Sequence, residues 1–141
     1  MAGALIFFDY GYGRREYYDP ERYHGTLRSF FQHRCHNDPF LYPGLQDITA
    51  SVDFTAVAES ATQAGLDLAG YTTQSAFLLD AGITDFAAAP PSSMQEYQQS
   101  QALKLLMLPT EMGTLVKAMG FTKNGNGRLR GFSLFDRRGD L

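Results

Sequence analysis

The first apolar run of the chain extends from Ala4 to Phe8 and ends at the polar sequence Asp9-Tyr10-Gly11. Every position of the run is apolar, which indicates a strand that is buried on both faces, as in a parallel α/β sheet. The run lies almost at the start of the sequence, and no partner strand precedes it. Because a strand buried on both faces needs neighbours, we expect this chain to form only part of its sheet.

Two helices are predicted from apolar spacing and end signals. From Val52 to Ala64 the apolar residues recur at three- and four-residue intervals, which predicts an amphipathic helix. Ser51 or Asp53 can cap its start, and Gly65 stands where a helix-ending glycine is common. A second helix is predicted over Ser93 to Leu108, where Ser93-Met94-Gln95-Glu96 fits a capping box.

The remaining pattern predicts shorter elements between and after these helices. They are a strand at Leu66 to Thr73, a short helix at Gln74 to Ala81 stopped by Gly82, a helical turn at Ile83 to Ala89, and a strand at Thr114 to Lys123. Asn124-Gly125-Asn126-Gly127 is a turn signal, so Gly131 to Phe135 is predicted to return as the second strand of a hairpin.

Between the first strand and the first helix, the segment from Gly11 to Asp47 is rich in Gly, Pro, Tyr, His and Arg. We expect a long irregular loop, with a short strand or helix at about Thr26 to His33. Loops of this length are usually functional or disordered. Several aromatic residues just before its start and in its first half argue against simple disorder, namely Tyr10, Tyr12, Tyr17, Tyr18 and Tyr23.

Composition and charge exclude some classes of function. The chain has 141 residues, of which 44% are hydrophobic and 19% charged, which fits one globular domain over residues 1–141. A net charge of -3 argues against broad binding to nucleic acid or to an anionic membrane. No stretch approaches the roughly 18 apolar residues needed to span a bilayer. The single cysteine, Cys35, fits a reducing compartment such as the bacterial cytoplasm.

Candidate chemistry concentrates at the end of the first strand and the start of the first helix. In open α/β sheets ligands bind beyond the carboxyl ends of the strands, which places Asp9-Tyr10-Gly11 at the edge of a site. The alternative is a turn in which Asp9 accepts backbone N–H groups. The segment from Asp47 to Phe54 either points polar groups into a cleft or simply caps the helix.

Two other motifs predict no site. Ligands drawn from His33-Arg34-Cys35-His36 cannot easily surround one metal ion, and the sequence has no second pair of ligands, so no metal is expected. A Cys-His nucleophilic pair there lacks an orienting third group. Gly11-Tyr12-Gly13 is only part of a phosphate-binding glycine motif, since Glu16 stands at the third glycine position.

Taken in order, these segments resemble the C-terminal part of the MidA-like S-adenosylmethionine-dependent methyltransferases, a class I family that includes the mitochondrial complex I assembly methyltransferase. Ser51 stands where the family has a histidine. The resemblance covers nearly the whole chain and is carried by Asp9-Tyr10-Gly11, Gly25-Thr26-Leu27-Arg28 with His33, Asp47 to Phe54, Thr73-Gln74-Ser75-Ala76-Phe77-Leu78, and Met112-Gly113.

The resemblance implies an α/β fold, the C-terminal half of a Rossmann-like class I methyltransferase sheet with a helical insertion. Its fifth, sixth and seventh strands correspond to Ala4–Phe8, Leu66–Thr73 and Thr114–Lys123. The family's glycine-rich cofactor motif lies on earlier strands. We therefore expect a single partial methyltransferase domain over residues 1–141, which binds no S-adenosylmethionine by itself although the full-length family uses it.

The resemblance also implies methyl transfer to a protein side chain such as arginine, with this chain contributing the acceptor side and inactive alone. The alternative is a non-catalytic protein-binding module with a tyrosine-rich surface. A protein substrate and self-association through an exposed sheet edge are expected. No catalytic residue is assigned, and the candidate substrate-binding residues are Asp9, Tyr10, Gly11, Thr26, Arg28, His33, Asp47, Thr49 and Gln74.

Overall fold

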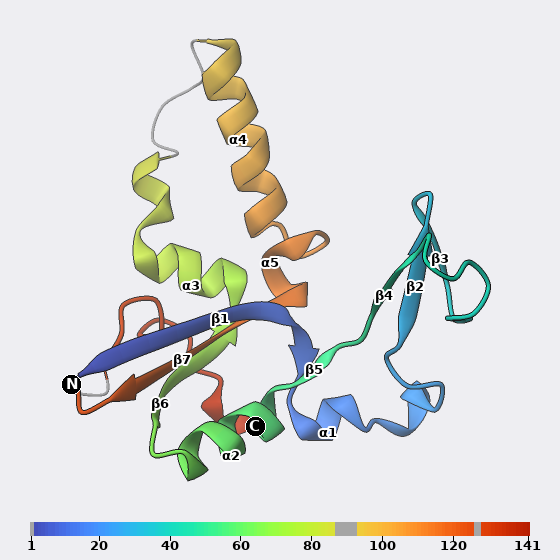
Figure 1. Cartoon of the computed structure of the whole chain (residues 1–141). Helices are drawn as coiled ribbons and strands as arrows, with labels where there is room; N and C mark the ends of the chain where they lie inside the picture. The colour runs from blue at the N-terminus through green and yellow to red at the C-terminus, as the bar shows by residue number, and fades with distance from the viewer. Residues whose placement is uncertain (1, 87–92, 126–127) are drawn as a thin grey trace.

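A four-stranded mixed sheet forms the centre of the computed structural model, which describes residues 2–86, 93–125 and 128–141 (Figure 1). Its strands are β1 (Gly3–Tyr12), β5 (Val52–Asp53), β6 (Asp67–Thr73) and β7 (Val116–Lys123), in the order β5-β1-β7-β6. β7 is antiparallel to both of its neighbours, and β5 runs parallel to the end of β1. The α/β class and the three principal strands expected from the sequence are confirmed.

The buried centre of the sheet is β7 rather than β1. Residues Val116 to Thr122 are all buried, because β1 pairs along one edge of β7 and β6 along the other. β1 is apolar but exposed, with Ile6 at 40% and Phe8 at 45% of their surface accessible. Its second edge pairs with β5 only at Gly11 and Tyr12, so no described strand covers that edge from Gly3 to Tyr10.

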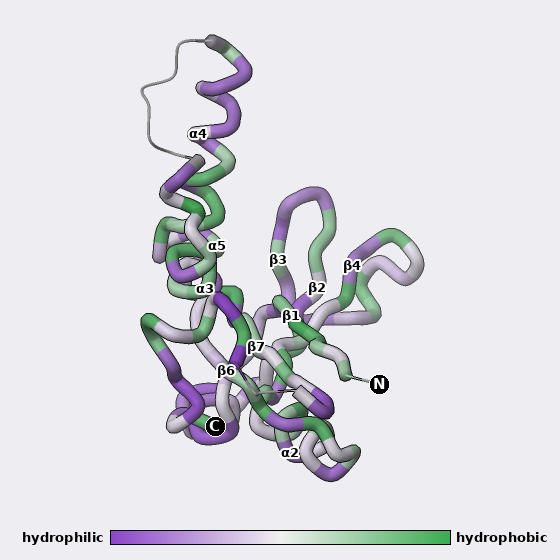
Figure 2. Tube along the Cα trace, turned by 90° about the vertical axis from the view of Figure 1, so that its left-hand side faces the viewer, coloured by the Kyte–Doolittle hydropathy of each residue, from purple (hydrophilic) through white to green (hydrophobic). Residues whose placement is uncertain are grey.

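Helices cover the two faces of the sheet. α2 (Phe54–Gln63) packs on one face, where Phe54 joins Tyr71, Met119 and Phe121 in the core. α3 (Gln74–Ala81) and the short α5 (Met112–Leu115) lie on the opposite side (Figure 1). α4 (Met94–Met107) extends away from the sheet, and Figure 2 shows that its far half is mostly hydrophilic.

The predicted helix ends are confirmed at the level of single hydrogen bonds. The carboxylate of Asp53 accepts the backbone N–H of Ala56 at 3.1 Å, and the hydroxyl of Ser93 accepts that of Glu96 at 3.2 Å. Gly82 ends α3 with a φ of 93°, in the left-handed region that favours glycine. The predicted turn at Ile83–Ala89 begins as the 3-10 helix η2 (Ile83–Phe86), and its remaining residues lie outside the described ranges.

The long segment between β1 and β5 contains more structure than the sequence indicated. It forms α1 (Arg14–Tyr17), the 3-10 helix η1 (Pro20–Arg22), and the strands β2 (Arg28–Phe31), β3 (Arg34–His36) and β4 (Asp47–Thr49). The strands form a separate antiparallel sheet in the order β3-β2-β4 (Figure 1). The turn between β2 and β3 places Gln32 and His33 at positive φ, 48° and 63°.

The predicted return strand at Gly131 to Phe135 is wrong. Both edges of β7 are already paired, so no backbone partner remains for a hairpin strand. Instead, the N–H groups of Gly131 and Ser133 donate to the carboxylate of Asp80 at 2.8 and 2.9 Å. Between them Phe132 is buried against β6 and β7. Part of the predicted turn, residues 126–127, lies outside the described ranges.

Candidate functional site

The sequence Asp9-Tyr10-Gly11 lies near the carboxyl end of β1, where β5 leads directly into α2. A Cβ atom on Gly11 would lie 2.3 Å from the carbonyl oxygen of Val52, so glycine is needed for β5 to pair here. The exposed carboxylate of Asp9 accepts the N–H of Tyr10 at 2.7 Å. Asp9 thus makes the predicted turn-like contact and still presents its carboxylate to solvent.

The small sheet brings together four more of the predicted residues. Arg28 pairs in register with Thr49, and Asp47 pairs with Phe30 two positions further along β2. Thr26 precedes this sheet. Its hydroxyl donates to the hydroxyl of Tyr17 at 3.4 Å and accepts the N–H of Ser51 at 3.2 Å. Through these bonds Thr26 connects the small sheet to α1 and to the segment that enters β5.

His33 and Gln74 lie apart from that group. His33 is exposed in the turn that joins β2 to β3. Gln74 is the first residue of α3 and is only 7% exposed. Its amide donates to the carbonyl of Leu106 at 3.0 Å, which ties α3 to the end of α4.

The histidine and cysteine motif on β3 shows no metal site. Within the described ranges no group of three or more His, Cys, Asp or Glu residues is placed to hold a metal ion. Cys35 is an exposed free thiol. Both ring nitrogens of His36 are buried without a hydrogen-bond partner, beside the ring of Tyr42.

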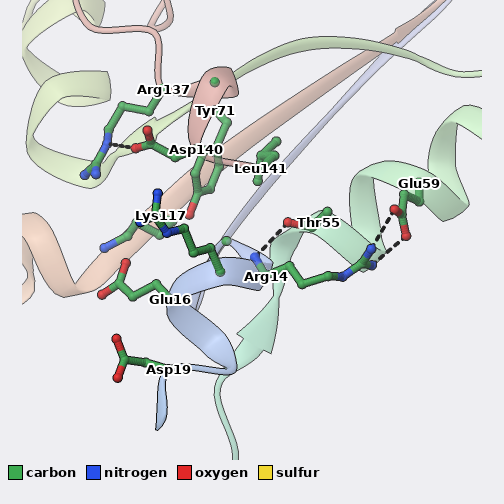
Figure 3. A pocket seen from close by; sticks show the side chains of 13 residues that line it. Arg14, Glu16, Asp19, Thr55, Glu59, Tyr71, Lys117, Arg137, Asp140 and Leu141 are labelled. Atoms are coloured by element: carbon green, nitrogen blue, oxygen red, sulfur yellow. Dashed lines mark hydrogen bonds and ion pairs between the residues drawn. The ribbon is translucent and has the colours of Figure 1, made fainter. Parts of the chain in front are cut away.

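A charged cavity that the sequence did not reveal opens beside the start of α2 (Figure 3). Its volume is about 770 Å³, and α1, β6, β7 and the last residues of the chain contribute to its lining. A Cβ atom on Gly13 would lie 2.1 Å from the carbonyl oxygen of Asp140, so this glycine allows the 3-10 helix η3 (Arg138–Asp140) to approach. The lining includes Arg14, Glu59, Tyr71, Lys117 and Arg137.

Ion pairs fix one side of the cavity. The guanidinium of Arg14 donates to both carboxylate oxygens of Glu59, at 2.8 and 2.6 Å, and lies 3.6 Å from the carboxylate of Asp53. The hydrogen bond with Arg14 holds the pKa of Glu59 below its ordinary value. The backbone N–H of Arg14 donates to the hydroxyl of Thr55 at 2.8 Å. These contacts attach α1 to the first turns of α2.

Two titratable groups are buried on the other side of the cavity. Tyr71 is 2% exposed, and burial raises its pKa to about 12. Lys117 is 8% exposed, and burial lowers its pKa. A lysine within the otherwise apolar stretch Val116-Lys117-Ala118-Met119 was the one signal in the sequence for this cavity.

Comparison with known proteins gives matches over different parts of the chain. The model of a family described as "putative S-adenosyl-L-methionine-dependent methyltransferase" matches residues 1–72. The protein arginine methyltransferase NDUFAF7 homolog of Drosophila melanogaster mitochondria is 32% identical over an alignment of 121 residues, and the match covers 82% of this chain and 25% of that protein.

Two crystal structures from Burkholderia thailandensis are similar to nearly the whole chain. One is a native structure, and the other is of a member of the same superfamily bound to S-adenosyl-homocysteine. Each is 47% identical, has a TM-score of 0.92 and covers 99% of this chain. The chain spans 38% and 36% of these two proteins, and about a quarter of the Drosophila one.

Proposed function

The chain belongs to the MidA-like family of S-adenosyl-L-methionine-dependent methyltransferases, and from this we propose that residues 1–141 form the acceptor side of such an enzyme's domain. The observation that carries the proposal is the position of the polar residues at one edge of the sheet. Asp9 and Tyr10 stand near the carboxyl end of β1, and Thr26 links the small sheet to the segment entering β5. In open α/β sheets, ligands bind at this edge.

The cofactor is held by residues outside this chain in our proposal. S-adenosylmethionine supplies a methyl group bound to a positively charged sulfur. Gly11, at the end of β1, and Gly13, just after it, leave no cradle for it, because the backbone of Val52 and that of Asp140 occupy the space beside them. The Gly11-Tyr12-Gly13 motif therefore offers no site for the cofactor. We expect the chain to transfer no methyl group alone.

A protein side chain such as arginine is the proposed methyl acceptor. The Drosophila relative is named for that activity. Asp9 and Asp47 present exposed carboxylates on β1 and at the start of β4. A carboxylate binds a guanidinium through charge-assisted hydrogen bonds and can hold it toward the methyl donor. In this role Asp9 and Asp47 bind and orient the acceptor, and neither is assigned a proton transfer.

A chimera tests the proposal. Residues 1–141 replace the matching segment of the relative that binds S-adenosyl-homocysteine, and transfer of radiolabelled methyl groups to protein arginine is measured. Asp9→Ala is expected to lower kcat/KM roughly tenfold or more, because an oriented charge pair is lost. The melting temperature should change little, because the Asp9 carboxylate is exposed and its hydrogen bond is to the next residue.

The control is Asp67→Ala, which removes an exposed carboxylate from the opposite end of the sheet, at the start of β6. It should leave turnover unchanged. If Asp9→Ala lowers the melting temperature while turnover per folded molecule stays constant, Asp9 is a turn residue and the acceptor role is wrong.

The second candidate function is a non-catalytic protein-binding module. Large aromatic side chains on the segment between β1 and β5 favour it, since Tyr18, Tyr23 and Phe40 are 69%, 81% and 82% exposed. Exposed aromatic residues suit protein interfaces. A chimera that folds, binds S-adenosyl-homocysteine and transfers no methyl group would support the module over the enzyme.

A further inference from the structure

The hydroxyl of Tyr71 faces the charged cavity without a protein partner. Tyr71 is 2% exposed and lines the cavity, and Figure 3 shows its oxygen pointing inward beside Lys117 and Glu16. Among the described residues, none forms a hydrogen bond with this oxygen. This oxygen is not among the described side-chain atoms that are buried without a partner, so solvent or a ligand can reach it from the cavity and supply the hydrogen bond.

Lys117 presents further free donors to the same space. Its ammonium group donates to the carbonyl of Thr114, which leaves two of its three N–H donors available. Lys117 is 8% exposed and forms no ion pair with any described carboxylate. A buried cation without a carboxylate partner is costly, and a bound anion offsets that cost.

Three of the four acidic side chains of the cavity pair with an arginine. Glu59 pairs with Arg14 at 2.6 Å and Asp140 with Arg137 at 2.7 Å, while Glu16 pairs with Arg22 at 3.4 Å. The carboxylate of Asp19 accepts the N–H of Glu21 at 2.9 Å. By contrast, Arg15 resembles Lys117 in having no ion pair within the described part of the chain. The lining carries as many acidic side chains as basic ones, and within the described part of the chain Lys117 and Arg15 are its cations without an ion pair, while Asp19 is its acid without one.

We propose that this cavity binds an oxyanion, the carboxylate or phosphate group of a small ligand, between the Tyr71 hydroxyl and the Lys117 ammonium group. The anion accepts one hydrogen bond from each. Arg15 adds positive charge at the rim, and the cavity of about 770 Å³ has room for more than the anionic group alone. The inference rests on the side chains of the cavity and holds whether or not the chain takes part in methyl transfer.

Thermal unfolding of the 141-residue chain tests the proposal, with inorganic phosphate and acetate as probes. Each probe is titrated against sodium chloride of equal ionic strength, because an anion that binds only the folded state raises the unfolding temperature with its concentration. At least one probe should raise it beyond the chloride control. The probe that does so distinguishes a phosphate ligand from a carboxylate ligand.

Two variants locate the effect. Tyr71→Phe and Lys117→Met should each weaken the apparent affinity roughly tenfold, the loss expected for one hydrogen bond to a charged group. The matched controls are Tyr23→Phe and Lys123→Met, which alter exposed residues outside the cavity lining and should leave the affinity unchanged. Tyr71→Phe removes a hydroxyl that bonds to no described residue, so it keeps the test valid if Lys117→Met does not fold.

Either of two results would overturn the proposal. One is an unfolding temperature that rises no further with phosphate or acetate than with chloride. The other is a rise of the same size in Tyr71→Phe as in the unaltered chain, which would place the anion elsewhere on the surface.

Discussion

At the scale of single residues, some roles are local, such as helix capping, whereas others depend on tertiary packing. Caps such as Asp53 and Ser93 were predictable, because they act on backbone groups three residues away. Tyr71 and Lys117 were not, because the cavity they line is built from segments that are distant in the sequence. The need for glycine at position 70 was not predictable either, because it arises from the ring of Phe132, which packs directly against Gly70.

Gly70→Ala should destabilise the fold through this contact. A Cβ atom at position 70 would lie 2.3 Å from the Phe132 ring. The ring has little room to move away, because it also packs against Gly120 on the neighbouring strand. Overpacking of this kind costs about 1–3 kcal/mol of unfolding free energy, measurable by urea denaturation. At Gly3 an added Cβ meets nothing within 4 Å, so Gly3→Ala is the control. Equal stability of the two variants would contradict the packing described here.

The buried phenol of Tyr71 predicts a specific loss of stability in alkali. The folded state keeps the proton up to a pKa of about 12, whereas the unfolded chain releases it at an ordinary pKa of 10.0. The protonated phenol therefore makes its full contribution to the free energy of unfolding below the pKa of the unfolded chain. This contribution is lost as the pH rises between the two pKa values, by at most about 1.4 kcal/mol per pH unit. Lys117, with a lowered pKa, acts in the opposite direction at lower pH.

Urea denaturation of the unaltered chain and of Tyr71→Phe across this pH range isolates the contribution of the phenol. As the pH rises, the unaltered chain should lose unfolding free energy relative to Tyr71→Phe, which has no phenol to titrate. Parallel curves would show that the phenol titrates normally in the folded state.

At the scale of elements, the helices and the long strands follow from the sequence, while the short strands do not. The helix of Phe54–Gln63 has a clear apolar period and both end signals. β3 and β4 have three residues each, too few to show alternation. β3 pairs with β2 across a turn with two non-glycine residues at positive φ, and β4 pairs with the other edge of β2. The prediction of a hairpin strand was wrong for a different reason. β1 and β6 occupy both edges of β7, and a local sequence pattern does not show such long-range pairing.

The open edge of β1 should cause the isolated chain to associate with itself. Leu5, Ile6, Phe7 and Phe8 are each at least 40% exposed, and unpaired apolar edges are templates for strand pairing. Size-exclusion chromatography with light scattering should find dimers or larger species. Ile6→Lys should reduce them, whereas Leu134→Lys, at an exposed site outside the sheet, should not. A chain that stays monomeric over a wide concentration range would contradict self-association through the open edge of β1.

At the scale of the whole molecule, the chain is similar in fold to one part of longer proteins. It superposes on the Burkholderia structures with a TM-score of 0.92 yet spans only 38% and 36% of them. The family was predictable because its short motifs occur in a fixed order, although each is weak by itself. The methyl acceptor was not predictable, because the sequence does not show which molecule would contact exposed residues such as Asp9 and Thr49.

The most direct test of the account is a calorimetric titration of S-adenosyl-homocysteine into the isolated chain and into the chimera with the Burkholderia relative. If residues 1–141 supply the acceptor side and the cofactor is held elsewhere, the chimera binds with an affinity close to that of the relative. The isolated chain then gives no binding heat. Micromolar binding to the isolated chain would contradict the account, because the cofactor site would then lie within these 141 residues.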